Sequence, residues 1–370
     1  MKRILVSVTN DLVTDQRVHK VCTTLFNNGF DILLIGRKLK NSQPLVRDYN
    51  TLRFKLFFNK GALFYAEYNL RLFFILLFLK KDILLSNDLD TLLANYMASK
   101  ISKSKLVYDS HELFTEVPEL IYRPFQQNFW LFIEQHIFPK LKYAYTVNEE
   151  IAKIYSDKYG VNVKVIRNIA PLYHNLNIDK NLAESVKGKS KMIILQGSGI
   201  NIDRGAEEAV EMMQYLTGFV LYIIGSGDVI ATLKSMVKDL ALSNKVFFKD
   251  KMPYENLMEY TKIADLGLSL DKNTNLNYTL SSPNKVFDYI QANTPILTSN
   301  TKIISKLILD KNIGIVTNSH NPIALAKTVE DIFLNEQQYN IWCKNLKEVA
   351  KELNWENESK KLMEIFNSID

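Results

Sequence analysis

Lys285 and Asp288 stand one helical turn apart in a segment whose composition is typical of an anion site. A short apolar strand is expected before it, and the segment brings its own helix start, with Ser282 as the cap and Pro283 in the first helical position. The free amides and positive dipole end of such a helix attract anions. With a cation and a carboxylate added, the segment suits a nucleoside diphosphate whose sugar diol binds Asp288. The alternative is a capped surface helix with one solvated ion pair.

Glycine-rich turns provide a second candidate site for phosphate. Gly197, Ser198 and Gly199 follow an apolar strand, and Arg204-Gly205 comes shortly after them. A Gly-x-Gly turn lets backbone amides approach a phosphate closely. The third glycine of the dinucleotide fingerprint is absent, because Ile202 occupies its position. Gly225 ends the next expected strand in the same way.

Polar residues also follow three expected strands of the first half. The first strand leads to Asn10, the second to Asn87, Asp88 and Asp90, and the third to Asp109, His111 and Glu112. A histidine at the rim of a sheet can donate to a sugar hydroxyl or orient an acceptor. The alternative for a lone histidine is a structural hydrogen bond.

Strands and helices alternate along the whole chain with short links. This pattern predicts an α/β protein with two doubly wound parallel sheets, whose ligands bind beyond the carboxyl ends of the strands. Strands are expected at residues 3–8, 31–36, 51–57, 83–86, 106–109, 145–147 and 163–166, then at 192–196, 220–225, 246–248, 265–270, 296–298 and 313–316.

Helical spacing predicts helices near residues 18–25, 63–79, 130–137, 322–334, 336–351 and 355–369. In the third of these, Trp130, Phe132, Ile133 and Ile137 are expected in the core, with Glu134 and His136 in solvent. Asn148 is expected to cap the helix that follows it. The polar residues 174–191 are expected to form a linker or surface loop.

The residues 282–296 resemble the donor-site motif of bacterial retaining glycosyltransferases of group 1 (family 4), which have the GT-B fold. Asp288 matches the second glutamate of the family's Glu-x7-Glu motif, and Leu280 occupies the position of the first. The family's glycine-rich loop carries two cations that bind the donor's diphosphate. Arg204 matches the second, whereas Gly199 occupies the position of the first, so Lys285 is expected to replace it. The residues 87–90 and 107–114 resemble the acceptor-domain signature of the same group.

This resemblance implies two Rossmann-like domains facing across a cleft. Residues 1–170 are expected to form the acceptor-side domain and residues 171–354 the donor domain, while residues 355–370 form a helix that crosses back to the first. The resemblance further implies transfer with retention at the anomeric carbon. No metal or other cofactor is expected, because the sequence has no paired Cys/His ligand set and its Asp88-Leu89-Asp90 lies in the half away from the donor. The residues expected from the resemblance are His111, Arg204 and Lys285 for catalysis; Gly197, Ser198, Gly199, Gly225, Asn284 and Asp288 for the donor; and Asn10, Asp109 and Glu112 for the acceptor.

The composition of the 370-residue chain is that of an ordinary globular protein, with 47% hydrophobic and 23% charged residues. Cys22 and Cys343 show no metal or disulfide spacing, which indicates a reducing cytoplasm. The most apolar segment, residues 70–79, is shorter than the roughly 20 residues that a spanning helix needs. The chain begins with Met-Lys-Arg and a strand-like run, too short for the apolar core of a signal peptide.

Charge is distributed unevenly. Residues 1–170 hold 24 Lys and Arg against 16 Asp and Glu, which leaves 22 against 24 in residues 171–370. A basic first half suits a membrane surface at the inner face or a phosphate-bearing acceptor, and the alternative is charge kept for solubility. Nucleic acid is not expected as a partner, because no basic run or binding motif is present.

The expected function is therefore transfer of a sugar from a nucleotide sugar to a saccharide or lipid-linked saccharide in cell-surface polysaccharide synthesis. Two alternatives stay open: a sugar-nucleotide epimerase of the same fold, and a non-catalytic nucleotide-sugar-binding protein. Product analysis without an acceptor separates the first from a transferase, and tight binding without turnover identifies the second.

Overall fold

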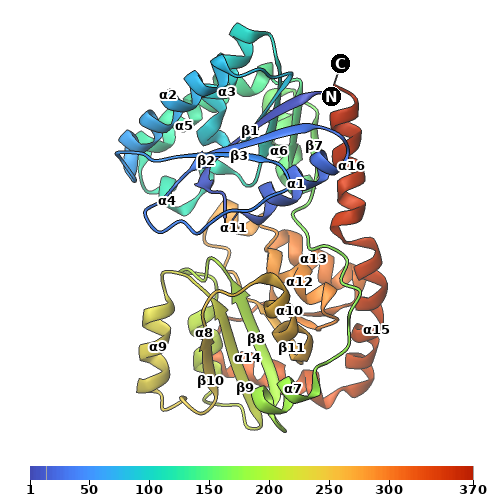
Figure 1. The fold of residues 1–370 in the computed structure, drawn as a ribbon. Coiled ribbons are helices and arrows are strands. Elements are labelled where there is room, and N and C mark those ends of the chain that lie inside the picture. The colour runs from blue at the N-terminus through green and yellow to red at the C-terminus, as the bar shows by residue number, and fades with distance from the viewer. Residues whose placement is uncertain (14, 370) are drawn as a thin grey trace. The chain divides into compact units, whose positions relative to one another are not determined.

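The computed structural model describes residues 1–13 and 15–369, which form two compact units (Figure 1). The first unit comprises Met1–Asn168 together with the segment from Glu358 onward, and the second comprises Ile169–Asn357. Helix α16 (Trp355–Asn367) therefore begins in the second unit and ends in the first.

The first unit contains a seven-stranded sheet in the order β3-β2-β1-β4-β5-β6-β7, and all its strand pairs are parallel. Its central strands are continuous runs of buried apolar residues, as expected when helices cover both faces of a sheet. The order of the strands reverses between β1 and β4, because β2 and β3 follow on one side of β1 and β4 to β7 on the other. This reversal creates the switch point where ligands bind in such sheets. The strands are β1 (Arg3–Asp11), β2 (Asp31–Arg37), β3 (Asn50–Phe54), β4 (Ile83–Asn87), β5 (Lys105–Ser110), β6 (Tyr143–Thr146) and β7 (Val163–Val165).

The helices of this unit begin and end with clear local signals. Asp15 accepts a hydrogen bond from the N–H of Val18 and caps α1, while Asn148 caps α6 through the N–H of Ile151, as predicted. Gly160 closes α6 in the left-handed conformation. The helices are α1 (Gln16–Asn27), α2 (Gly61–Phe78), α3 (Leu89–Ser102), η1 (Phe114–Glu116), α4 (Pro118–Ile121), α5 (Pro124–Ile137), η2 (Phe138–Lys140) and α6 (Glu149–Tyr159).

The second unit contains a six-stranded parallel sheet in the order β10-β9-β8-β11-β12-β13. Its switch point lies between β8 and β11. The strands are β8 (Lys191–Gly197), β9 (Phe219–Gly225), β10 (Val246–Lys249), β11 (Leu266–Ser269), β12 (Ile296–Ser299) and β13 (Gly314–Thr317). The helices are α7 (Lys180–Lys187), α8 (Ala206–Met212), α9 (Ile230–Asp239), α10 (Tyr254–Ile263), α11 (Leu276–Thr279), α12 (Asn284–Gln291), α13 (Lys302–Lys311), α14 (Pro322–Leu334) and α15 (Glu336–Glu352).

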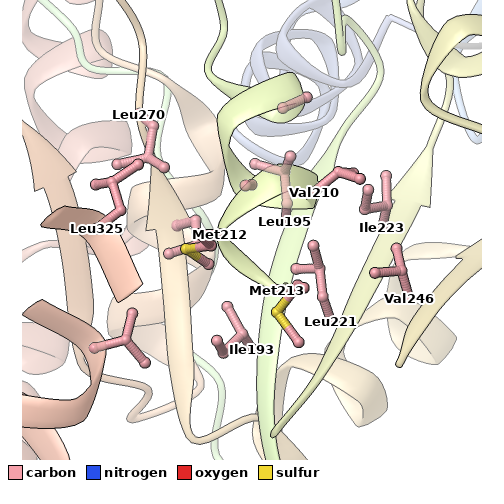
Figure 2. Packing of buried hydrophobic residues seen from close by; sticks show 14 of the residues in the cluster. Ile193, Leu195, Val210, Met212, Met213, Leu221, Ile223, Val246, Leu270 and Leu325 are labelled. Carbon is pink, nitrogen blue, oxygen red and sulfur yellow. The ribbon is translucent and has the colours of Figure 1, made fainter. Parts of the chain in front are cut away.

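The core of this sheet fixes the strand ends that carry the candidate site. Figure 2 shows Ile193 and Leu195 of β8 beside Leu221 and Ile223 of β9, with Val210 of α8 packed over them. All five side chains are almost completely buried. The predicted fold class of two parallel α/β domains is thereby confirmed.

One helix face was predicted wrongly. Phe132 was expected in the core but is 59% exposed, and Glu134 was expected in solvent but is buried. Helix α5 is rotated so that Glu134 faces α6, where its Oε1 accepts bonds from Nζ of Lys158 at 3.0 Å and the hydroxyl of Tyr159 at 2.5 Å. His136 is exposed, as predicted.

Two element boundaries also differ from the prediction. The strand expected at residues 51–57 ends at Phe54, because the N–H groups of Phe57 and Phe58 donate to the carboxylate of Glu67 instead of to a neighbouring strand. The expected loop 174–191 contains α7, which Asp179 caps. Leu182, Ala183 and Val186 of α7 pack against the core, so a few apolar contacts sufficed to form a helix in a polar segment.

Candidate functional site

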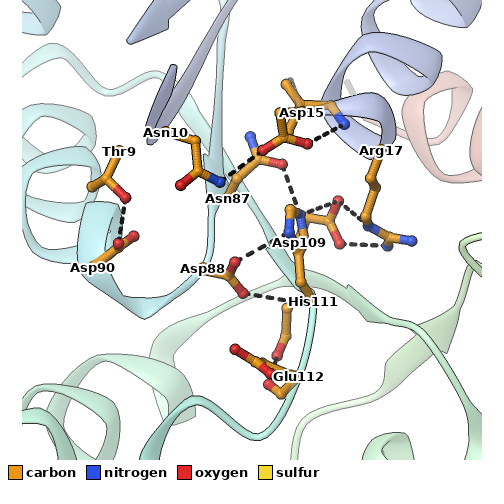
Figure 3. Close-up of polar contacts among 12 residues, drawn as sticks. Thr9, Asn10, Asp15, Arg17, Asn87, Asp88, Asp90, Asp109, His111 and Glu112 are labelled. Atoms are coloured by element: carbon orange, nitrogen blue, oxygen red, sulfur yellow. Dashed lines mark hydrogen bonds and ion pairs between the residues drawn. The ribbon is translucent and has the colours of Figure 1, made fainter. Parts of the chain in front are cut away.

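His111 lies just beyond the end of β5 in a closed network of hydrogen bonds (Figure 3). Its Nδ1 is 3.1 Å from Oδ2 of Asp88, and its Nε2 is 3.3 Å from Oδ2 of Asp109 and 3.2 Å from Oδ1 of Asn87. Asn87 directs this oxygen at the ring because its Nδ2 donates to the carbonyl of Ser7. The backbone N–H of His111 also donates to Asp88 at 2.8 Å. Both ring nitrogens therefore face oxygen acceptors, an arrangement that favours the doubly protonated imidazolium.

The electrostatics agree with that geometry. Burial alone would lower the pKa of His111, but Asp88 and Asp109 raise it to about 9. Burial likewise opposes the ionised form of Asp109, but Arg17 and His111 lower its pKa to about 2. Burial raises the pKa of Asp88 to about 7, against the opposing effect of His111. His111 is thus a fixed cation and hydrogen-bond donor at neutral pH, poorly suited to accept a proton.

Arg17 anchors this network from α1, and the sequence analysis missed it. Its Nε and Nη2 bind both oxygens of Asp109 at 3.1 and 2.6 Å, and its Nη1 donates to the carbonyl of Ile166. Both side chains are almost fully buried, which makes this a bidentate pair shielded from water. The available signal was an arginine next to Val18 on the apolar face of a helix, four residues before Val21.

The predicted acceptor-side residues occupy different environments. Asn10 is exposed at the end of β1 and donates to Asp15 at 3.0 Å. Asp109 is completely buried and bound to Arg17, so it acts on an acceptor only by orienting His111. Glu112 is half-buried, and its carbonyl accepts a bond from the hydroxyl of Ser110. The structure thus brings Asp109 and His111 into direct contact.

In the second unit, the glycine turns after β8 and β9 interlock. The N–H of Ser226 donates to the carbonyl of Gly197 at 3.1 Å, and the N–H of Ile200 donates to the carbonyl of Ser226 at 3.0 Å. Gly225 has φ +135°, and a Cβ there would lie 1.8 Å from the carbonyl oxygen of Gly197. A side chain at this position would therefore separate the two turns. Ser198 and Gly199 are exposed at the rim beside the switch point.

Arg204 and Lys285 converge on a carboxylate that the sequence analysis did not single out. Nη1 of Arg204 is 2.9 Å from Oδ1 of Asp271, and Nζ of Lys285 is 3.4 Å from Oδ2. Asp271 is buried just beyond the end of β11. The guanidinium of Arg204 also lies over the ring of Tyr278, 4.2 Å from its centroid.

The turn at Gly205 explains why Arg204 reaches this position. Gly205 has φ +74°, and a Cβ there would lie 2.4 Å from the carbonyl oxygen of Leu270. The glycine therefore lets the turn lie directly against the end of β11. A hydrogen bond of 2.9 Å from the N–H of Lys272 to the carbonyl of Asp203 fastens the same contact.

Arg204, Lys285 and Asp271 shift one another's pKa values. Burial would raise the pKa of Asp271, but Lys285 and Arg204 lower it. Burial lowers the pKa of Lys285, and Asp271 only partly offsets this effect. For Arg204, the opposing effect of burial is overcome by Asp271, which raises its pKa. The cluster carries a net positive charge, as required to attract an anion at the end of the sheet.

Asp288 lies on the first turns of α12 and is held by two donors. Its Oδ2 accepts from Nε2 of Gln196 at 3.0 Å, and its Oδ1 accepts from the hydroxyl of Tyr254 at 3.2 Å. Gln196 is oriented in turn by the hydroxyl of Thr261, which donates to its Oε1 at 2.7 Å. Neither Gln196 nor Tyr254 was predicted, although Gln196 is a polar residue at the end of a buried strand.

The start of α12 differs from the prediction. Ser282 was expected to cap the helix with Pro283 in its first position, but the helix begins at Asn284 and Pro283 takes the cap position. The extended backbone of the cap, with φ −60°, suits proline, and no side chain caps the helix. Asn284 is exposed there. Lys285 is not part of a solvated ion pair, because its side chain is only 11% exposed and binds Asp271.

Among residues 1–13 and 15–369, no group of three or more His, Cys, Asp or Glu is arranged to hold a metal ion. Cys22 and Cys343 are both free thiols.

Comparison with known proteins agrees with this architecture. Residues 177–349, just under half of the chain, match the family described as glycosyl transferases group 1. No curated protein sequence matches the chain significantly.

Several solved structures share the fold over nearly the whole chain. Sucrose-phosphate synthase from Thermosynechococcus elongatus is 14% identical, with a TM-score of 0.79 over 99% of this chain and 98% of that one. HepE from Anabaena, in complex with UDP and glucose, is 13% identical, with a TM-score of 0.75 over 100% of both chains. WaaG, a glycosyltransferase involved in lipopolysaccharide biosynthesis, is 14% identical, with a TM-score of 0.74 over 99% and 100%.

The two parallel sheets and the likeness to these structures over nearly the whole chain define the GT-B fold. Within the chain, residues 177–349 are similar to group 1 of the glycosyl transferases. The match includes residues 282–296, so their resemblance to group 1 is confirmed, whereas family 4 and retention stay predictions.

Proposed function

We propose that this chain is a retaining, metal-independent glycosyltransferase that uses a nucleoside diphosphate sugar. The observation that carries the proposal is the convergence of Arg204 and Lys285 on Asp271 at the switch point of the second sheet. Two cations held 2.9 and 3.4 Å from one carboxylate are close enough together to bind one diphosphate. The turn after β8 is exposed at Ser198 and Gly199, where its backbone amides can approach a phosphate.

Each residue then has a defined task. Arg204 and Lys285 stabilise the negative charge that develops on the departing diphosphate, the role that a metal ion would otherwise fill. Asp288, fixed by Gln196 and Tyr254, accepts hydrogen bonds from the ribose diol. His111, held as a cation, donates to a sugar or acceptor hydroxyl and does not serve as the base.

The reaction exchanges one bond at the anomeric carbon for another. The acceptor oxygen attacks from the face that the diphosphate leaves, the acceptor proton passes to the departing phosphate, and the anomeric configuration is retained. HepE has been captured with UDP and glucose, which supports a nucleotide sugar as the donor. WaaG takes part in lipopolysaccharide biosynthesis, which supports a saccharide or lipid-linked acceptor at the cytoplasmic face of the membrane.

The test is a panel of labelled nucleotide sugars with extracted lipid acceptors, assayed with and without EDTA. Full turnover in EDTA and an unchanged anomeric configuration by NMR are expected. Loss of turnover in EDTA would remove the metal-independent mechanism, and an inverted product would remove retention. Interconversion of sugars without an acceptor would indicate an epimerase, and binding without turnover on any acceptor would indicate a non-catalytic protein.

A further inference from the structure

Helix α2 carries large apolar residues on two opposite sides, although only one of these sides is covered. Phe64, Tyr68, Leu72 and Leu76 are buried in the core of the first unit, and the hydroxyl of Tyr68 donates to the carbonyl of Val8 at 2.6 Å. The opposite side carries four apolar residues at helical spacing, which we call the α2 stripe: Leu63, Leu70, Phe74 and Phe78, with exposures of 59%, 60%, 48% and 79%.

Such a helix is unusual for a water-facing surface. A surface helix normally carries polar residues opposite its buried face, and a helix that is apolar all round is found in a core or a membrane. Within residues 1–13 and 15–369, α2 is the one helix long and apolar enough to cross a membrane by length and composition. Its buried face is fixed in the core, so α2 can meet lipid while it lies in the interface plane without crossing it.

The neighbouring helix α3 extends the apolar surface. Helices α2 and α3 pack side by side in the first unit. Met97 and Ile101 of α3 are 47% and 60% exposed. Exposed apolar side chains on two helices that pack together indicate an interaction site.

The charges near the α2 stripe are mostly positive, which indicates a negatively charged partner. Lys80 and Lys81 precede β4, Lys103 precedes β5, and Lys105 is the first residue of β5. These lysines lie near one another because Ile83 of β4 pairs with Lys105. Lys100 adds a further cation at the end of α3. One exposed acidic residue, Asp82, lies among these five lysines. Glu67, on the stripe side of α2, forms an ion pair with Arg71 at 2.6 Å and accepts hydrogen bonds from two backbone N–H groups.

We propose that the α2 stripe and the adjoining lysines dock the first unit onto a bilayer surface that contains anionic lipids. The apolar side chains enter the boundary between headgroups and acyl chains, and the lysines contact the negatively charged headgroups. The inference rests on the proposed function in one respect: a lipid-linked acceptor would give the protein a reason to bind the membrane surface. Binding itself requires no nucleotide sugar and is measured without one.

The experiment measures sedimentation of the full chain with vesicles of phosphatidylcholine, alone or mixed with phosphatidylglycerol. The wild type is expected to bind the mixed vesicles more strongly and to lose part of that binding at high salt. Leu70→Asp with Phe74→Asp should lower the partition coefficient at least about tenfold, because two apolar side chains no longer leave water. Leu309→Asp with Leu334→Asp, at 62% and 81% exposed positions of the second unit, is the matched control and should bind like the wild type.

Charge reversal separates the contribution of the lysines to vesicle binding from that of the apolar α2 stripe. Lys80→Glu with Lys103→Glu should remove the preference for phosphatidylglycerol, whereas Lys306→Glu with Lys344→Glu, at exposed positions of the second unit, should retain it. Circular dichroism confirms that each variant is folded. Equal vesicle binding by the wild type and the Leu70/Phe74 variant would overturn the proposal. A wild-type dimer that this variant dissociates, without vesicle binding, would overturn it in favour of a second copy of the chain.

Discussion

Arg204 and Lys285 hold the two oxygens of one carboxylate, although 80 residues separate them in the chain. Arg204 reaches Asp271 from the turn after β8, and Lys285 reaches it from the first turn of α12. Group 1 relatives are expected to carry two cations in the loop after the first strand, where this chain has Gly199 in one of the positions. The geometry therefore supports Lys285 as the replacement for the missing cation.

Removal of either cation should slow transfer far more than it destabilises the protein. Arg204→Ala and Lys285→Ala are each expected to lower kcat by about a hundredfold or more, because one donor to a developing negative charge typically contributes that much. Steady-state kinetics with saturating donor measure the effect. Lys306→Ala, at an exposed position of the same unit, is the control and should keep wild-type turnover. Near-full turnover in both site variants would show that the diphosphate binds elsewhere.

Asp271 should supply the counter-charge for Arg204 and Lys285 when no diphosphate is bound. Asp271→Asn leaves two partly buried cations without a counter-charge, which is expected to cost about 1–3 kcal/mol of unfolding free energy. A bound nucleoside diphosphate supplies negative charge to the same two groups. UDP should therefore raise the Tm of this variant more than it raises the Tm of the wild type.

A matched control shows whether the larger UDP-induced increase in Tm is specific to Asp271→Asn or follows from any loss of stability. Asp265→Asn removes a carboxylate that binds Nζ of Lys187 at 2.6 Å. Asp265 directly precedes β11, so it lies at the amino end of that strand and away from the carboxyl end that carries the candidate site. Asp265→Asn should lower the Tm while leaving the increment produced by UDP at the wild-type value. Equal increments in all three proteins would mean that Arg204 and Lys285 do not bind the diphosphate.

His111 should titrate well above the ordinary range for histidine. Asp88 and Asp109 raise its pKa from 6.5 to about 9 despite burial. Because the folded pKa is raised, the stabilisation is complete below about pH 6.5 and is lost as the pH rises through about 9. The unfolding free energy of the wild type minus that of His111→Gln should therefore shrink between these pH values.

NMR titration of the imidazole nitrogens measures the same property directly. Asp88→Asn should lower the pKa of His111, since it removes the first of the two carboxylates. His19 provides an internal contrast, because burial and Arg47 lower its pKa. A His111 pKa at or below 6.5 would contradict the closed network and would restore this residue as a candidate base.

The sheets could be predicted from the sequence because their signals are local. Residues 83–86 and 192–196 are runs of mostly apolar residues followed by polar or glycine turns, and this pattern identifies a buried parallel strand and its ligand-facing end. His111 was found by its position after such a strand, whereas Arg204 was assigned through the family resemblance of the glycine-rich loop. Asp271 follows a strand by the same rule as His111 and could have been found with it.

Other features depend on contacts that no local pattern contains. Glu134 is buried because α6 brings Lys158 and Tyr159 to it, whereas helical spacing alone could not tell which side of α5 faces α6. The position of Arg17 depends on Asp109, which lies 92 residues later in the chain. Pairing over such distances is decided by the complete fold, so these partners could be identified only once the fold was known.

Asp288 should determine donor affinity through the sugar diol and not through the phosphates. Asp288→Asn is expected to raise the KM for the nucleotide sugar about 10- to 100-fold with a smaller change in kcat, because one or two charge-assisted hydrogen bonds are weakened. Inorganic pyrophosphate has no ribose. Its affinity for Asp288→Asn should equal its affinity for the wild type, whereas its affinity for Arg204→Ala should be lower. Calorimetry with UDP and with pyrophosphate measures both affinities. Asp331→Asn, at a 56% exposed carboxylate of α14, should leave both unchanged. Equal weakening of UDP and pyrophosphate by Asp288→Asn would show that this carboxylate orders the phosphate site and does not bind the diol.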